Sequence, residues 1–394
     1  MNKSIYICAA AAMMLASCSN DEVVEQAQEK GISFRSLTGL STRALNATQK
    51  TLEDNGMYVT TFTENGTRLY PETHYVLQQS VWMADPAQTW GGYEKLSFYL
   101  TYPKLSEWDG DADAKIEGED SEVFITVDED IPDQKDYLAV YLPDVSKTKD
   151  AVPAKMQHVL SSVEIWAKND NKAYTYKVKG IRICGIAKRR SFVLSEFLSG
   201  QASDNLHTID FGARDYEYRY DTEVELGSQA KSLMDKAGNA ILIPQPSNIA
   251  MRWDGKSTTD DPDTFVGTYL SVLVNLTAKA GASIYPAGST KTNETYGWVS
   301  VPVDFQWKSG KKYVYTLDFS GGAGKVDPRD PGNDVDAGGK DPDKAEPILG
   351  GKIRFGVTVS EWGTDDKDVD LKDSEKFDVT VDGWTDDTKD APLK

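Results

Sequence analysis

The sequence predicts a mostly β protein made of sandwich-type domains, and three observations support this prediction. Short runs in which apolar and polar residues alternate with a period of two recur along the chain. Clusters of Gly, Pro, Asn and Asp separate these runs, as turns separate the strands of a sandwich. Few segments have the 3.6-residue period of an amphipathic helix, and aromatic residues, which suit half-buried sheets, make up 10% of the chain.

The expected elements follow one another along the chain. After a weak first run, GISF from Gly31, clear strand-like runs begin at Gly56, Glu94, Ser121, Asp136, Ser161, Ala173, Thr268, Gly297 and Lys311. We expect one short helix in RSFVLSEFLSGQ, which ends at Gly200, and a turn in PAKMQHVLSS.

Changes in composition suggest where the domains begin and end. Residues 143–155 are polar and contain two prolines, so we expect one domain over 44–150 and a second over 151–319. Residues 320–351 are rich in Gly, Pro and Asp and nearly lack apolar residues, which predicts a flexible linker. Its reach as a coil, roughly 30 Å, would allow the following segment to return to its own domain or to reach another subunit.

The N-terminus predicts export and lipidation. Lys3 precedes an apolar run that is too short to be a membrane anchor. The run ends in LASC, which resembles a bacterial lipobox and implies a signal peptide over 1–17 and acylation of Cys18. The alternative is an ordinary secretory signal in which this cysteine is incidental. Cys184 then has no disulfide partner, and its apolar surroundings predict a buried thiol.

The composition argues against several classes of function. A net charge of −19 disfavours binding to nucleic acid phosphates. Three histidines show no metal or triad spacing, and there is no phosphate loop or nucleophile elbow, so we expect no enzyme, no catalytic residue and no cofactor. With 62 acidic residues, a carboxylate pair for glycoside hydrolysis stays open.

One acidic stretch has the spacing of a calcium-binding loop. In WDGDADAKIEGED, positions 1, 3, 5, 8 and 12 of such a loop are Asp109, Asp111, Asp113, Ile116 and Asp120. Ala114 stands where glycine makes the sharp turn, Asp replaces the bidentate Glu, and no helices are expected beside it. We therefore expect a solvated acidic loop, and no metal site.

The chain ends in two copies of one strand pattern. F-x-V-T-V-x-x-W-x-x-D begins at Phe355 and again 22 residues later at Phe377. The apolar faces of the two copies consist of Ile353, Phe355, Val357 and Val359 in the first and Phe377, Val379 and Val381 in the second. Polar residues alternate with them, so each copy suits a sheet with one solvated face. Near the N-terminus, Ile32-x-Phe34 repeats Ile353-x-Phe355, as expected of a strand and its replacement.

Several segments together resemble the fimbrillin family, the subunits of type V pili. They are the lipobox, STRA, WGGYEKLSFYLTYP, MQHVLSSVEIWAK, ILIPQ and FQWKSGKKYVYTLDF, in this order along most of the chain. The resemblance implies two transthyretin-like β-sandwich domains, a lipidated precursor, cleavage after an arginine, and polymerisation by strand exchange. The second copy of the terminal strand has no clear counterpart in the family pattern.

Applied to this sequence, the resemblance implies specific sites and partners. A trypsin-like protease would cut between Arg43 and Ala44, so that 18–43 is a propeptide with a removable strand and 352–394 is the donor region. The partners would be other copies of this chain and related pilus subunits, at the outer membrane and in the cell-surface fimbria. The precursor would contact the membrane through its lipid.

Two alternatives to a pilus stalk subunit stay open. A tip or anchor subunit of the same family is one, although a tip needs no donor tail and this chain has one. The other is a monomeric surface lipoprotein that binds glycans through exposed aromatic residues. The candidates for that role are Trp82, Trp90, Trp253, Trp298 and Trp307.

Overall fold

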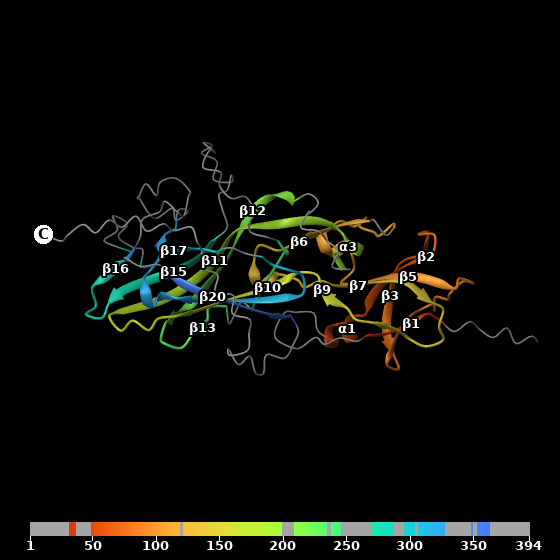
Figure 1. The fold of residues 1–394 in the computed structure, drawn as a ribbon, viewed down its shortest axis with the longest axis horizontal. Coiled ribbons are helices and arrows are strands. Elements are labelled where there is room, and N and C mark those ends of the chain that lie inside the picture. The colour runs from red at the N-terminus through yellow and green to blue at the C-terminus, as the bar shows by residue number, and fades with distance from the viewer. Residues whose placement is uncertain are drawn as a thin grey trace, which may run out of the picture.

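The computed structural model describes residues 31–36, 49–118, 121–198, 209–234, 238–245, 269–286, 295–303, 306–327, 348–349 and 353–362. The fold is mostly β, as predicted. The molecule is elongated, with the first strands of the chain at one end and the later strands at the other (Figure 1).

The N-terminal part is an eight-stranded sheet in the order β8-β1-β4-β3-β2-β5-β7-β9. Its strands are β1 (Ser33–Ser36), β2 (Met57–Thr63), β3 (Arg68–Gln78), β4 (Val81–Ala84), β5 (Lys95–Tyr102), β7 (Leu138–Ser146), β8 (Val152–Ala154) and β9 (Gln157–His158). β8 and β9 lie at opposite ends of this order, yet two residues separate them in the chain. The sheet therefore curls around its own core, to which α1 (Gln49–Asn55) adds Leu52.

The C-terminal part consists of two sheets that enclose a second core. One has the order β13-β10-β18-β20, with β14 beside β10; the other has the order β12-β11-β15-β17-β19, with β16 beside β15 and β6 beside β11. Their strands are β6 (Glu122–Thr126), β10 (Ser161–Lys168), β11 (Tyr174–Val193), β12 (Ile209–Glu225), β13 (Lys231–Ser232), β14 (Ala240–Leu242), β15 (Tyr269–Ala278), β16 (Ser283–Tyr285), β17 (Gly297–Pro302), β18 (Lys311–Asp318), β19 (Lys325–Val326) and β20 (Arg354–Glu361).

Short helical segments complete the described fold: α2 (Ser106–Asp109), η1 (Ile131–Asp133), α3 (Leu194–Leu198) and η2 (Phe319–Gly321). The helix expected from Arg190 is shorter than predicted, because residues 190–193 continue β11 and pair with β6. PAKMQHVLSS contains the end of β8 and all of β9 in addition to a bend.

Strand pairing crosses the expected boundary at residue 150 in both directions. β6 precedes that boundary but pairs with β11 of the C-terminal part, and β8 and β9 follow it but belong to the N-terminal sheet. The cause is a shared core: Phe62 and Tyr99 of the N-terminal sheet belong to the same buried cluster as Ile125 and Ile183. A composition change in the chain does not report such long-range contacts.

The start of the expected linker is part of the fold. β19 pairs with β17, and the Asp327 backbone N–H donates to the Trp298 carbonyl at 3.0 Å. The Asp327 carboxylate is buried and accepts hydrogen bonds from Tyr269 at 2.9 Å, Ser271 at 2.5 Å and Arg182 at 3.3 Å. This Asp327 cluster fixes the chain where the tail begins; residues 328–347 lie outside the described residues.

Candidate functional site: the two terminal strands

β1, the strand expected to be removed, lies inside the N-terminal sheet. It pairs antiparallel with β4 on one side and parallel with β8 on the other, and Phe34 is the partner of both Trp82 and Val152. β1 therefore joins the first and third strands of the sheet order. Without it, the facing edges of β4 and β8 would lose their hydrogen-bond partners.

The apolar side chains of β1 and the residue before it fill the N-terminal core. Ile32 is 1% exposed and Phe34 0% exposed. The Phe34 ring makes edge contacts with Tyr75, at a centroid distance of 5.4 Å, and with Phe98, at 5.2 Å. Burial of these two side chains contributes about 3–6 kcal/mol gross. The segment is thus a core element, although it precedes the expected cleavage site.

β20, the first copy of the terminal strand, lies in the sheet of its own chain. It pairs antiparallel with β18 over eight positions, from Arg354 opposite Asp318 to Glu361 opposite Lys311. It is the last strand in its sheet order, and the described residues place no strand on its other edge. The structure therefore shows the self-paired arrangement that linker length had left open.

The apolar face of β20 points toward the C-terminal core but is incompletely covered. Phe355, Val357 and Val359 lie opposite Leu317, Tyr315 and Tyr313 of β18. These three β18 residues are 0–5% exposed, whereas Phe355 and Val357 are half-buried and Val359 is 37% exposed. The side chains of β20 are more exposed than those of β18 because, among the described residues, β20 has a partner strand on one side only.

Two anchors hold the ends of β20. At its start, Ile353 is 7% exposed and packs against Gly324, where an added Cβ would lie 2.9 Å from Ile353 Cδ1. Gly324 also has a φ of +72°, so a side chain is disfavoured there on both grounds. At its end, Trp362 is 8% exposed, and its backbone N–H donates to the Gly310 carbonyl at 2.8 Å.

Trp362 also connects β20 to the N-terminal sheet. Its ring stacks on His158 of β9, with centroids 4.0 Å apart and planes inclined by 12°. His158 Nδ1 is 2.7 Å from Asp136 Oδ2, and both residues are buried. No motif spacing in the sequence predicts this contact; its one signal is the tryptophan repeated in the two copies of the terminal pattern.

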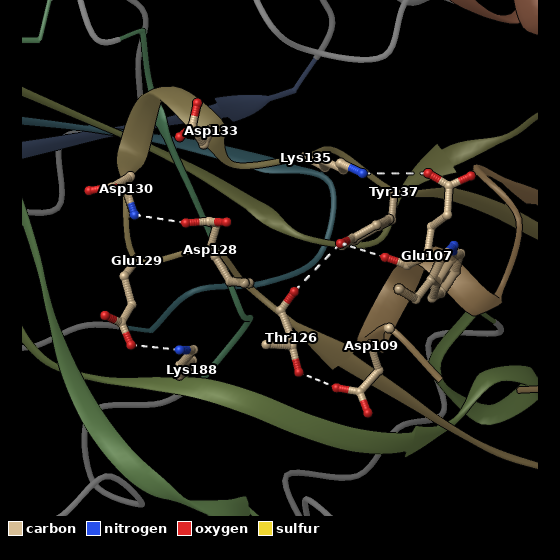
Figure 2. A pocket seen from close by; sticks show the side chains of 13 residues that line it. Glu107, Asp109, Thr126, Asp128, Glu129, Asp130, Asp133, Lys135, Tyr137 and Lys188 are labelled. Carbon is tan, nitrogen blue, oxygen red and sulfur yellow. Dashed lines mark hydrogen bonds and ion pairs between the residues drawn. The ribbon is translucent and has the colours of Figure 1, made fainter. Parts of the chain in front are cut away.

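An open acidic pocket of about 490 Å³ lies between α2, β6 and η1, and Figure 2 shows the side chains that line it. Three of its carboxylates have cationic partners. Lys188 Nζ lies 2.5 Å from Glu129 Oε1, and Lys135 Nζ lies 3.5 Å from Glu107 Oε2. Asp109 is bound by Arg189 at 2.7 Å. Burial raises the pKa of Asp109, but hydrogen bonds from Arg189 and Thr126 outweigh this effect and hold the pKa below its usual value.

The loop with calcium-like spacing does not gather its carboxylates around one point. Asp109 ends α2 and faces Arg189, while Asp111 and Asp113 are exposed; Asp120 lies outside the described residues. Within the part of the chain that the structure describes, no three His, Cys, Asp or Glu side chains are grouped closely enough to hold a metal ion.

The family model for fimbrillin-like proteins matches residues 42–329. The chain belongs to the fimbrillin-like family. This family consists of structural pilus subunits that associate with one another in cell-surface fimbriae. The sequence has no significant match among curated proteins.

Among solved structures, similar chains include ones named as cell adhesion proteins from Bacteroides and Parabacteroides. The match to one from Bacteroides eggerthii has 14% identity and a TM-score of 0.44, and covers 85% of this chain and 97% of that one. One from Parabacteroides distasonis has 12% identity and a TM-score of 0.44, with 84% and 98% covered. The tip fimbrial protein Mfa3 from Porphyromonas gingivalis has 10% identity and a TM-score of 0.36, with 84% and 98% covered.

Several predicted sites of this fimbrillin-like chain lie outside the described residues: Cys18, Arg43, Ala44, Phe377, Val379 and Val381. Their roles stay predictions. Cys184 is buried on β11, as expected. No described helix is both long and apolar enough to span a membrane.

The tryptophans proposed for glycan binding are unsuitable as a surface platform. Trp82, Trp90, Trp298 and Trp307 are all 1–3% exposed. Trp82, Trp90 and Trp307 belong to the two cores, and the Arg182 guanidinium lies over the Trp298 ring, 4.0 Å from its centroid. A buried indole cannot stack on a sugar at the surface, so these four residues contradict that alternative. Trp253, the fifth candidate, lies outside the described residues.

Proposed function

We propose that this fimbrillin-like chain is a stalk subunit that polymerises by donor-strand exchange after proteolysis removes β1. One observation carries this proposal. β1 joins β4 to β8 and contributes to the core, yet it precedes Arg43 in the chain. A cut at Arg43 would therefore separate a core strand from the rest of its sheet.

Removal of β1 would prepare the sheet for a replacement strand. Ordering ten residues costs about 10–20 kcal/mol of backbone entropy, whereas burying four apolar side chains returns roughly 6–12 kcal/mol. Because the entropy cost is at least as large as the gain from burial, a donor strand cannot displace a strand that is already paired. It can bind between two open edges, where backbone hydrogen bonds each add about 1 kcal/mol. The cut would create those edges.

The donor would come from the duplicated tail of another subunit. Its apolar residues are those of the two copies, Ile353 to Val359 and Phe377 to Val381. The tail also favours a stalk over a tip subunit, because a terminal subunit needs to accept a strand and has no strand to donate. Tip and anchor roles are therefore the second choice.

Before the cut, the precursor would be held at the outer membrane by lipid on Cys18. Cleavage between Arg43 and Ala44 by a trypsin-like protease would release the subunit from this anchor together with β1. Anchoring and self-capping would end in a single step, so that assembly starts after the subunit has reached the cell surface.

The proposal is tested by changing the cleavage site. Arg43→Ala should leave a lipidated precursor that gives no denaturation-resistant ladder on a gel. Arg35→Ala is the matched control: Arg35 is exposed on β1, within a paired strand, so this variant should be cut and assembled normally. A ladder from Arg43→Ala, or assembled subunits that begin at Cys18 by mass spectrometry, would contradict the proposal.

A further inference from the structure

We propose that the two copies of the terminal strand have different roles. The first copy, β20, is a permanent strand of its own sheet, and the second copy, Phe377 to Trp384, is the strand donated to another subunit. This inference rests on the proposed donor-strand function and assigns that function to one part of the tail. It differs from the simplest expectation, in which the longer apolar face of the first copy makes it the donor.

β20 fits closely into the sheet of its own chain. All eight of its residues have partners on β18, and both ends are anchored, by Ile353 against Gly324 and by Trp362 against His158. Withdrawal of β20 would break these contacts together and expose the edge of β18, whose inward side chains are 0–5% exposed. Donation of the second copy leaves every one of these contacts in place.

The two copies differ at the position that anchors the start of β20. Aligned on their phenylalanines, Ile353 corresponds to Glu375. Ile353 packs against Gly324 in a buried position, where a carboxylate would lose its water. The second copy is therefore poorly suited to replace β20 on β18, and the copies are not interchangeable.

The two copies also differ in the charge of their solvated faces. The first copy has Gly356 and Ser360 where the second has Asp378 and Asp382. Charges on an apolar strand keep it soluble while it has no partner, which a donor needs before assembly and a permanent strand does not. Fourteen residues, 363–376, separate Trp362 from the second copy, and a segment of this length can extend to about 45 Å. That reach suits transfer to a neighbouring subunit.

A disulfide lock tests the inference directly. Val314 and Thr358 are cross-strand partners on β18 and β20, half-buried on the face away from the core. Directly opposed residues in antiparallel strands have a Cα separation that a disulfide accepts. In Val314→Cys with Thr358→Cys, the cleaved chain contains one further cysteine, the buried Cys184. Oxidation should then link β20 to its own sheet.

We expect oxidised, cleaved subunits to form the same ladder as reduced subunits and as the Thr358→Cys single variant. Truncation after Lys372, which removes the second copy and keeps β20, should abolish the ladder while leaving the monomer's thermal unfolding unchanged. These two results together support the inference.

Two other outcomes would overturn the inference, and they distinguish a wrong strand assignment from a wrong function. If oxidised subunits stay monomeric and a reductant restores the ladder, β20 itself is donated, and donor-strand exchange stands without our assignment. If truncation after Lys372 and truncation after Pro347 both polymerise fully, the tail donates no strand, and the proposed function fails as well.

Discussion

The Ile-x-Phe pattern occurs at the start of both β1 and β20, but its two phenylalanines are buried to very different extents. Phe34 has strands on both sides and is completely buried, whereas Phe355 has one neighbouring strand and is half-buried. The same residue pattern thus gives different burial of the phenylalanine, because the number of partner strands decides how much of an apolar face is covered. Loss of β1 would open a gap in a core, while loss of β20 would expose an edge.

The largest expected effect comes from matched truncations of the two phenylalanines. Phe34→Ala should lower the free energy of unfolding of the uncut precursor by about 3–5 kcal/mol, as for other fully buried phenylalanines. Phe355→Ala should cost about 1–2 kcal/mol, because its side chain is partly exposed before the change. Urea denaturation of both precursors measures the difference.

The cleaved forms provide the control for these variants. Phe34 leaves with the propeptide, so cleaved Phe34→Ala and cleaved wild type should have equal stability. A loss of the same size before and after cleavage would mean that β1 is not removed. Equal losses for the two phenylalanines in the precursor would contradict the burial difference.

A smaller effect is expected at the end of β20. Trp362→Ala should destabilise the C-terminal part by about 2–3 kcal/mol, below the value for a core tryptophan because the strand lies at an edge. Trp362→Phe keeps a ring that can stack on His158 and should lose about 1 kcal/mol. Thermal unfolding would show the order, and equal losses for Ala and Phe would argue against the stacking contact as an anchor.

The smallest effect concerns a contact that neither strand makes. Asp109 bound to Arg189 has a lowered pKa, so the folded state binds this proton less readily than the unfolded state. The pair therefore stabilises the fold at neutral pH, and this contribution is lost as the pH falls below about 4.

Asp109→Asn should accordingly reduce stability at pH 7 by about 1 kcal/mol, and the difference from wild type should shrink toward pH 3. Precursor and cleaved protein should respond alike, since α2 and β11 are distant from the cut in the chain. Urea denaturation at several pH values checks this. A loss confined to one form would show that cleavage alters the fold beyond the N-terminal sheet.

Much of the fold was predictable because strand alternation is a local property. All nine clear runs form strands, and the buried positions of β10 and β18 follow the period of two. β3 was missed because it is mostly exposed or half-buried and lacks a clear apolar face. The pairing of β6 with β11 was missed because residues far apart in the chain decide it.

The candidate site was predictable in its parts and not in its arrangement. Alternation identified Ile32, Phe34 and the apolar face of β20, but linker length could not show that β20 returns to its own sheet. The contact between His158 and Trp362 joins residues 204 positions apart and follows no motif spacing. Such contacts depend on how the two parts of the fold pack together.

The Asp327 cluster has a mechanical consequence for a fibre that is pulled by flowing liquid. Tension between subunits would act on each subunit through its tail. The force would act first on the antiparallel pair of β18 and β20 and then at Asp327. There, hydrogen bonds from β11 and β15 hold one buried carboxylate, so several bonds on two strands resist the pull together. Each subunit would thus resist tension at two sites in series, the pairing of β18 with β20 and the Asp327 cluster. The weaker of these two sites would set the force that the fibre withstands.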